Sequence, residues 1–330
     1  MPSIAFMPTP SGPLHLGSLF TYFAGWLFAR KCGWDVVIVT DVGVQEWRNE
    51  RDMVAWRLSM LEMLGSLGIP PDKMFPIDDL LAIWKSMNGD FMSEDTRRGL
   101  CYLCTCANHS AQMLPNDPCQ DNFGIPSKET VKATPKEATW RFRLNGTKVE
   151  EHHLRLIRFY NTLGVKAFIR GRDLLDHVAL HESLQQAMGM AVIPTYFVPC
   201  IITNEWHMKL SKSSNAASME QIFAGKFGAR KAAPSLILRG LWQCLQGFAT
   251  APDTLTEMVH EFRVSRITDK HSIPEMQVWI NVWYAGKMLA QRQKQTELAR
   301  QCAGEVEHIK NIAGHREYQF EQEQGEGVGG

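Results

Sequence analysis

Two short segments, far apart in the chain, carry the side chains best suited to chemistry on a phosphorylated ligand. The first, Pro8–Ser18, follows a short apolar run and contains His15 among prolines and glycines. Its imidazole would lie at a helix start, where hydrogen-bond donors and the positive end of the helix dipole favour anions. The second, Lys209–Ser213, places two amines on a loop after another apolar run. Such amines could follow the charge that develops on departing phosphates.

Each segment alone also has an ordinary structural interpretation. His15 could cap or pack the helix, and Lys209 and Lys212 could be solvated surface lysines. The combination favours a binding role, since the prolines and glycines shape a turn that brings a ligand close to the backbone. The residues of this turn are Pro10, Gly12 and Gly17.

Together, the two segments resemble the HIGH and KMSKS signatures of class I aminoacyl-tRNA synthetases. Arg170–Leu175, with the sequence RGRDLL, is similar to the VRG(E/A)DLL segment of glutamyl-tRNA synthetases. The resemblance covers roughly residues 3–245. The chain looks too short to hold the anticodon-binding domain of the full-length glutamyl enzymes. In this it resembles the glutamyl-queuosine tRNA(Asp) synthetases, which attach glutamate to a modified base of the anticodon loop.

The resemblance implies an α/β fold: a class I synthetase Rossmann-like parallel sheet, a zinc-binding insertion and a C-terminal helical region. It implies a ligase that uses ATP and Mg²⁺ to activate an amino acid before transferring it to tRNA. The implied catalytic residues are His15, Lys209 and Lys212. The implied nucleotide contacts are Pro10, Ser11, Gly12, His15, Gly17, Ser18, Arg172, Asp173, Leu174, Lys209 and Lys212.

The resemblance assigns the amino acid, expected to be glutamate, to Asp41, Tyr160 and Arg170. An arginine guanidinium suits a carboxylate because it binds both oxygens at once. A structural salt bridge from Arg170 to a nearby aspartate, Asp173 or Asp176, is an equal alternative.

The sequence departs from the family three residues before the proline motif, which begins at Pro8. Ala5 stands where the family has an arginine that clamps glutamate. ATP use therefore follows from the residues more securely than glutamate does. Two other functions stay open: an amino-acid ligase with a non-tRNA acceptor, and a catalytically silent paralogue that binds RNA or a partner.

Four of the eight cysteines gather between Cys101 and Cys119. Tyr102–Cys106 followed by Cys119 resembles the zinc-binding motif of the glutamyl-queuosine group, which implies Zn²⁺ on Cys104, Cys106 and Cys119. Thiolates at short spacing with a distant third suit a tetrahedral zinc site. Cys101 or His109 would be the fourth ligand. Free buried thiols, or a site that has lost its metal, are the alternative.

Hydrophobic periodicity predicts the elements that would position these residues. Strands are expected at 4–7, 35–40, 139–144, 166–170 and 196–202, and helices at 19–30, 48–68, 80–87 and 181–190. Everything beyond 214 reads helical, including a long helix with a capping box formed by Ser272 and Glu275. These helices could dock an RNA stem or complete the core.

The expected domains are 1–100 (first half of the catalytic domain), 101–165 (cysteine-rich insertion), 166–215 (second half), 216–320 (helical region) and 321–330 (disordered tail). The formal net charge of zero means that tRNA would need a local basic patch. With 45% hydrophobic and 21% charged residues, the composition is that of an ordinary soluble protein. We see no signal peptide and no membrane-spanning stretch, and expect a cytoplasmic monomer.

Overall fold

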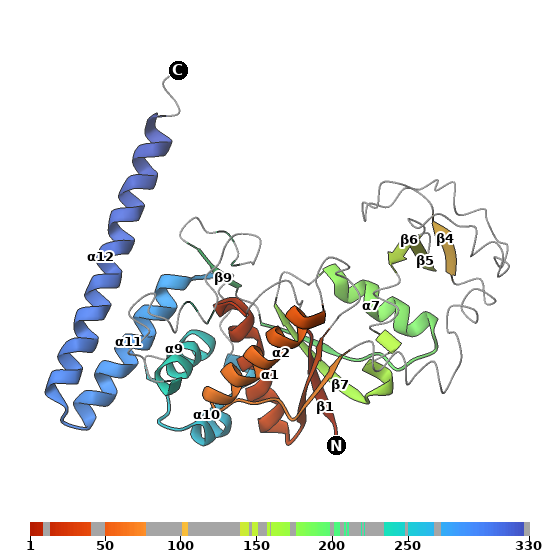
Figure 1. The fold of residues 1–330 in the computed structure, drawn as a ribbon, viewed down its shortest axis with the longest axis horizontal. Coiled ribbons are helices and arrows are strands. Elements are labelled where there is room, and N and C mark those ends of the chain that lie inside the picture. Colours follow the sequence, from red (N-terminus) through yellow and green to blue (C-terminus); the bar gives the residue numbers. More distant parts are fainter. Residues whose placement is uncertain are drawn as a thin grey trace.

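The computed structural model describes residues 1–8, 14–40, 50–76, 101–104, 139–144, 147–150, 157–158, 160–171, 176–198, 201–204, 234–247, 250–266 and 272–326, with the single positions 208, 210, 219 and 221. An α/β core lies at the centre, a small antiparallel sheet lies at one end, and helices form the other end (Figure 1). The expected α/β architecture with a parallel sheet and C-terminal helices is confirmed.

The central sheet has five parallel strands in the order β3-β2-β1-β7-β8. Its strands are β1 (Ser3–Phe6), β2 (Asp35–Thr40), β3 (Lys73–Pro76), β7 (Val165–Gly171) and β8 (Thr195–Val198). β2 is buried at every position, as its unbroken apolar sequence predicts. From β1 the chain builds the sheet outward in one direction, then returns at β7 and builds in the other. The switch point therefore lies between β1 and β7.

Helix α1 (Leu16–Cys32) covers one face of this sheet and is almost entirely buried. It ends at Gly33, whose left-handed φ of 67° lets its N–H reach the carbonyls of Ala29 and Arg30. The helix expected at 19–30 is confirmed and extends further at both ends. Helix α2 (Glu50–Ser66) agrees with the expected 48–68, whereas the helix expected at 80–87 lies outside the described residues.

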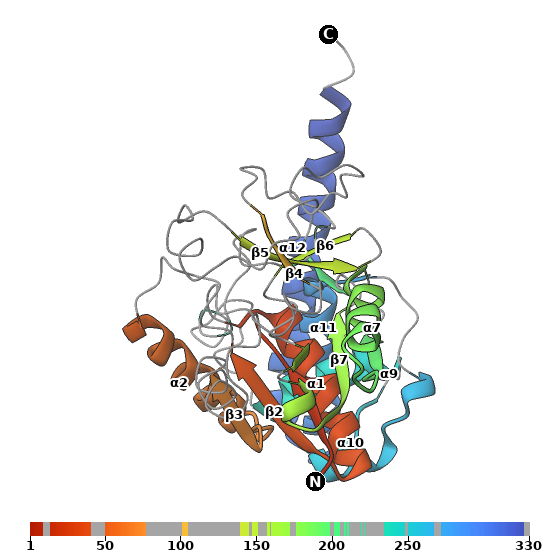
Figure 2. The same cartoon turned by 90° about the vertical axis from the view of Figure 1, so that its right-hand side faces the viewer.

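The C-terminal helices share one core with α1. These helices are α9 (Pro234–Gln246), α10 (Leu255–Glu261), α11 (Glu275–Arg292) and α12 (Thr296–Glu326). A continuous apolar cluster joins Phe23 of α1 to Trp242 of α9 and Trp279 of α11. They therefore complete the core, which is one of the two roles expected for them. Figures 1 and 2 show α12 continuing well past the end of α11.

The expected insertion contains more regular structure than predicted. Strand β5 (Thr139–Leu144) is confirmed, and it lies between β4 (Cys101–Cys104) and β6 (Thr147–Glu150) in an antiparallel sheet. The two outer strands were not predicted. Each is only four residues long, which is too short for a clear alternation of apolar and polar residues.

Four other expectations need correction. The apolar run 196–202 is not one strand, because β8 stays in the central sheet while β9 (Ile201–Thr203) pairs with β10 (Ser272–Pro274). The strand β10 also interrupts the region expected to be wholly helical. Helix α7 spans Asp176–Ala187 rather than 181–190. Helix α12 includes 321–326, where a disordered tail was expected; its many Glu and Gln residues are good helix formers.

Ser272 does not cap α11. It pairs with Ile201 in the β10–β9 ladder, and the helix begins directly after Pro274 without a side-chain cap. The capping box that does form belongs to α10, where Thr254 and Glu257 bond reciprocally to each other's backbone N–H. Both sequences fit the motif. The box does not form at Ser272 because this residue pairs with β9 instead.

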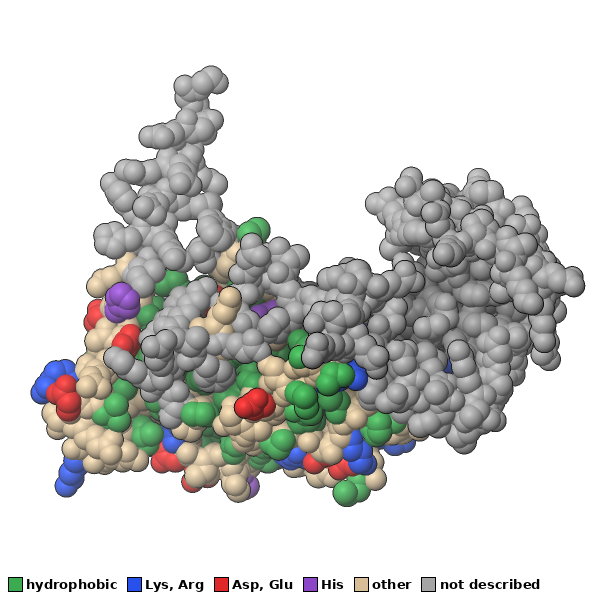
Figure 3. Space-filling view, viewed as in Figure 1, with side chains coloured by type: hydrophobic (Ala, Val, Ile, Leu, Met, Phe, Trp, Pro, Cys, Tyr) green, Lys and Arg blue, Asp and Glu red, His purple; other side chains and the backbone are tan. Residues whose placement is uncertain are grey.

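On the face shown in Figure 3, basic and acidic side chains of the described residues are intermixed, as a net charge of zero allows. In the part of the chain that the structure describes, no helix combines the length and apolarity needed to cross a membrane.

Candidate active site

The carboxyl edge of the central sheet brings together the best candidates for a site. In parallel sheets, ligands bind beyond the carboxyl ends of the strands at the switch point. His15 follows β1 in the chain, and Arg170 is the penultimate residue of β7. These two strands are the neighbours that flank the switch point. The histidine and the arginine therefore belong to the same edge of the sheet.

His15 is the N-cap of α1, with extended backbone dihedrals of −105° and 168° and only 8% exposure. The Ser18 N–H donates to Nδ1 (3.3 Å), and Nε2 lies 3.1 Å from Ser18 Oγ. Since Nδ1 accepts, the ring proton lies on Nε2, which donates to the hydroxyl. The capping role is thus what the structure contains, and a phosphate oxygen would have to compete with Ser18 Oγ for the Nε2–H.

Gly17 leaves space for the His15 ring. A Cβ at this position would lie 3.1 Å from both Cε1 and Nδ1 of His15. The ring folds back over the first turn of the helix, and glycine leaves the space for it. The sequence predicts Gly17 for approach of a nucleotide, and the structure adds this second reason.

Described residues within and around the segment Lys209–Ser213, the lysine loop, pack against the start of α1. The Leu210 N–H donates to the Ile202 carbonyl (2.8 Å), which returns the chain alongside β9. Beyond the loop, the Met219 N–H donates to the Leu14 carbonyl (2.8 Å). Leu14, Ile202, Leu210 and Met219 are all buried in one apolar cluster. The chain on both sides of the lysine loop is therefore fixed beside the turn that contains His15, the histidine turn.

Arg170 is held by two contacts on the face of the sheet opposite α1. Its guanidinium carbon lies 5.0 Å from the centre of the Phe168 ring, and its Nη1 lies 3.2 Å from Nδ1 of His181 on α7. Asp173 and the side chain of Asp176, which the sequence offered as alternative partners, lie outside what the structure describes. His181 was not predictable from the sequence, since a lone histidine on a helix is an ordinary feature.

Tyr160 lies beneath the same edge and is almost fully buried, with 1% exposure. Its ring packs on Phe168 with 4.2 Å between centroids, and its hydroxyl donates to Met7 Sδ (3.6 Å). Ala5 belongs to the same apolar cluster and is 4% exposed. The surroundings of Ala5 are therefore apolar, although the resemblance places a carboxylate-binding arginine at this position.

The remaining site residues expected from the sequence lie outside the described residues. They are Pro10, Ser11, Gly12, Asp41, Arg172, Asp173, Leu174, Lys209, Lys212, Cys106, His109 and Cys119. Among the described residues, no cluster of metal-ligating side chains is present. Cys101 and Cys104 are the two ends of β4. The zinc site predicted on Cys101, Cys104, Cys106 and Cys119 stays a prediction.

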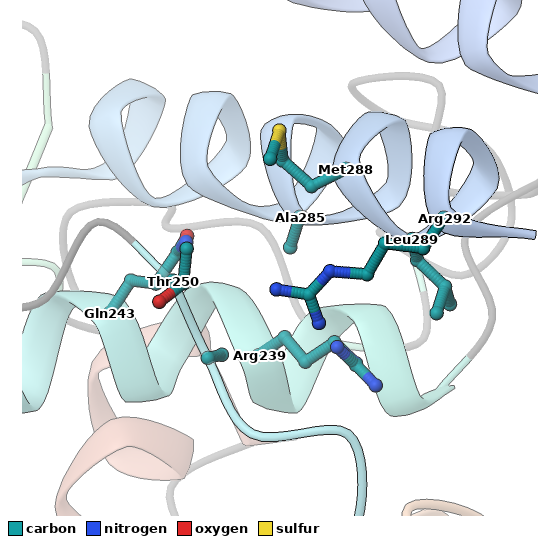
Figure 4. Close-up of a pocket in the computed structure, with 8 residues that line it drawn as sticks. Arg239, Gln243, Thr250, Ala285, Met288, Leu289 and Arg292 are labelled. Atoms are coloured by element: carbon teal, nitrogen blue, oxygen red, sulfur yellow. The ribbon is translucent and has the colours of Figure 1, made fainter.

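A small cavity between α9 and α11 lies beside a network of polar contacts that joins these helices (Figure 4). Arg239 is 5% exposed, and its two terminal nitrogens donate to Asp253 Oδ1 (2.9 Å) and to the Asp253 carbonyl (2.7 Å). Arg292 Nη1 donates to the same Oδ1 at 3.3 Å. The shared aspartate thus joins α9, α11 and the segment before α10, and the cavity lies beside this network.

Comparison with known proteins gives a consistent relationship. No family model matches the chain. The chain is 26% identical over 309 residues to the glutamyl-Q tRNA(Asp) synthetase of Pseudomonas syringae pv. tomato, covering 83% of this chain and 97% of that protein. It is 23% identical over 284 residues to the enzyme of that name from Rhodobacter capsulatus, covering 71% and 97%.

A crystal structure of a glutamate tRNA ligase from Elizabethkingia meningosepticum, in complex with its amino acid, has a similar fold. The TM-score is 0.63 at 16% identity, over 88% of this chain and 70% of that one. A glutamate-tRNA synthetase from Elizabethkingia anophelis gives 0.61 over the same fractions. Sequence relatives that span most of the chain show distant homology to the glutamyl-Q tRNA(Asp) synthetases, and the fold is similar to that of the glutamate-tRNA ligases.

Proposed function

We propose that the protein activates an amino acid with ATP, forming an aminoacyl-adenylate and pyrophosphate, and transfers the aminoacyl group to tRNA. Glutamate is the proposed amino acid, and the queuosine base of tRNA(Asp) is the acceptor to test first. Both follow the names of the relatives. The resemblance from the sequence leads to the same pair.

One observation carries the proposal: the two ends of the lysine loop are fixed beside the histidine turn. The Met219 N–H bonds to the Leu14 carbonyl, directly before His15. Ile202, where the loop segment begins, lies 3.8 Å from a Cβ built at Gly17. Lys209 and Lys212 lie between these anchor points in the sequence, and we propose that their amines bind the phosphates of the same ligand.

The chemistry needs positive charge more than it needs an acid or a base. When a carboxylate attacks the α-phosphate, charge develops on the α-phosphoryl oxygens and on the departing pyrophosphate. His15 would donate its Nε2–H to an α-phosphoryl oxygen. Lys209 and Lys212 would neutralise the charge on the departing pyrophosphate. Mg²⁺ bound to the triphosphate would add further positive charge. Arg172 would add a cation near the phosphates.

Glutamate itself is supported by Arg170, whose guanidinium suits a carboxylate. Ala5 weakens that support, because its buried apolar surroundings offer no cation there. The decisive experiment is ATP–pyrophosphate exchange with each of the twenty amino acids, with and without tRNA. Exchange with glutamate alone is expected. Exchange with another amino acid would replace glutamate in the proposal, and exchange with none would favour a silent paralogue.

The acceptor is tested by labelling tRNA(Asp) with radioactive glutamate, with and without its queuosine base. Product is expected only with the modified tRNA, and periodate treatment should abolish it, because periodate cleaves the queuosine diol. Labelling of unmodified tRNA would point to the 3′ end instead. A product that forms equally well without RNA would reject tRNA as the acceptor.

Zinc belongs to the proposal as a structural metal of the insertion, on Cys104, Cys106 and Cys119. Elemental analysis of protein purified without chelators should give zinc near equimolar with the chain. Cys106→Ser should lower that content and increase hydrogen exchange at β4, because metal binding stabilises the local fold. Cys32→Ser, at an exposed free thiol, is the control. Absence of zinc from the unmodified protein would reject the site.

A further inference from the structure

We infer that His181 is a positioning residue, which holds the Arg170 guanidinium in place for the substrate carboxylate; this inference rests on the proposed function. The two side chains come from different elements, β7 and α7, on the face of the sheet opposite α1. Arg170 stands at the carboxyl edge beside the switch point. His181 is buried next to Arg170, with 7% of its surface exposed.

The chemistry of the contact fixes the state of the histidine. A guanidinium carries only N–H donors, so Nδ1 of His181 must be the acceptor of the 3.2 Å hydrogen bond from Nη1. The ring proton therefore lies on Nε2, and the imidazole is neutral. A doubly protonated ring has no acceptor and could not make this bond.

Two contacts then orient one guanidinium. Phe168 lies two residues before Arg170 on the same face of β7, and its ring is 5.0 Å from the guanidinium carbon. The ring supports the group by a cation–π contact, while His181 fixes its rotation through Nη1. Phe168 is itself 3% exposed and held against Tyr160. The arginine thus rests on a rigid buried base, and we assign its remaining N–H groups to the substrate carboxylate.

Ordering this long side chain before binding should strengthen substrate affinity. A free arginine loses rotamer freedom when it binds, and that loss weakens the complex. An arginine already held by His181 has lost this freedom on folding. Because the carboxylate contact would be the same in the ground state and the transition state, loss of His181 should raise KM and leave kcat nearly unchanged.

The test compares two variants of nearly equal shape in ATP–pyrophosphate exchange. His181→Leu removes the acceptor, whereas His181→Asn keeps an oxygen close to the position of Nδ1. His181→Leu should raise the KM for the amino acid about two- to tenfold, the range for ordering one long side chain, with kcat within about twofold. His181→Asn should restore most of the wild-type KM. The KM for ATP should not change in either.

The exposed His308 on α12 provides the matched control, and His308→Leu should leave both constants unchanged. Thermal unfolding of each variant establishes that it is folded at the assay temperature. Equal KM values for His181→Leu and His181→Asn would overturn the inference. So would a fall in kcat at constant KM.

A second measurement does not depend on activity. Nitrogen-15 NMR of the histidine rings distinguishes a protonated from an unprotonated Nδ1. In the wild type His181 should have Nδ1 unprotonated and Nε2 protonated, and Arg170→Leu should shift the Nδ1 signal. A proton on Nδ1, or a signal that ignores Arg170→Leu, overturns the inference even if the enzyme is active. If exchange occurs with no amino acid while the NMR result holds, the proposed function fails and the contact stands.

Discussion

The two faces of the central sheet are built differently. The α1 face carries the large core, which runs from β1 and β2 through α1 to the C-terminal helices and includes residues at both signature segments. The opposite face carries a small separate cluster around Tyr160, Phe168 and Leu184, with the Arg170–His181 contact at its edge. The large core fixes the proposed triphosphate side of the site. The small cluster forms the proposed amino-acid side, where residues can change with less effect on the fold.

A matched pair of leucines tests this difference most strongly. Leu27 on the α1 face and Leu184 on the opposite face are both fully buried helical residues. Leu27→Ala should lower the free energy of unfolding by about 4 kcal/mol and Leu184→Ala by about 2–3 kcal/mol, because a small cluster relaxes more easily into the space left behind. Urea unfolding of both variants measures this. Equal losses, or a larger loss at Leu184, would contradict the distinction between the faces.

The lysine loop should affect rate without affecting folding. Lys212→Ala should lower kcat for activation about 10²- to 10³-fold, equivalent to one transition-state contact of about 3–4 kcal/mol. Its urea midpoint should match the wild type. Lys310→Ala, on an exposed turn of α12, is the control and should leave kcat unchanged. An unchanged rate in Lys212→Ala would remove the loop from the mechanism.

Gly17 tests the geometry of the histidine turn at a smaller scale. Gly17→Ala introduces a Cβ 3.1 Å from two ring atoms of His15, so the ring must shift by a few tenths of an ångström. We expect about a tenfold fall in kcat, near 1.4 kcal/mol, with stability unchanged or slightly raised, since alanine favours the helix. Single-turnover adenylate formation measures the step. A wild-type rate would show that the ring position is not critical.

The smallest effect concerns the ionic contact that fastens α1 to the sheet edge. Partial burial raises the pKa of Asp72, but hydrogen bonds from Arg30 and the Val36 N–H, with the charges of Arg30 and Lys73, outweigh it and lower the pKa. Because folding lowers this pKa, the charged Asp72 stabilises the protein at pH values above its ordinary pKa of 3.8. This stabilisation is lost as the pH falls through the folded-state pKa.

Asp72→Asn should therefore destabilise the protein at neutral pH, and the difference from the wild type should shrink as the pH falls below 3.8. With the aspartate side chain 33% exposed, screening limits the loss to about 1 kcal/mol. Chemical unfolding at several pH values checks this. Glu307→Gln, in an exposed pair with Lys310, should cost less than about 0.5 kcal/mol. A pH-independent difference for Asp72→Asn would show that the ionic contact is not its cause.

The sequence predicts β1, β2 and β7 of the central sheet, and most accurately the strand that is buried on both faces; the short edge strand β3 was not predicted. Asp35–Thr40 is this buried strand, and its predicted bounds match the structure. The break between β8 and β9 could have been predicted from a proline, which an analysis of hydrophobic periodicity does not consider. Residue 199 is a proline in the middle of the run, and proline cannot donate to a strand ladder. The β9–β10 pairing itself joins segments far apart in the chain, which local patterns do not predict.

The candidate site shows the same limit. Motif order identified His15 and the lysine loop, and the structure brings the loop's flanks to the histidine turn. The partners that orient these residues were not predictable in the same way. Ser18 lies three residues from His15, a spacing typical of helix caps, so it could have been anticipated. His181 reaches Arg170 only because α7 packs on β7, and this depends on the tertiary fold.

The pairing of β9 with β10 links the lysine loop to the far end of the chain. β9 leads into the loop, and β10 leads directly into α11, which packs along α12. A chain cut at the expected 215/216 boundary would leave β9 without its neighbour and the α1 core half open. The position of β9, which precedes the lysine loop, therefore depends on the C-terminal part of the chain through its pairing with β10.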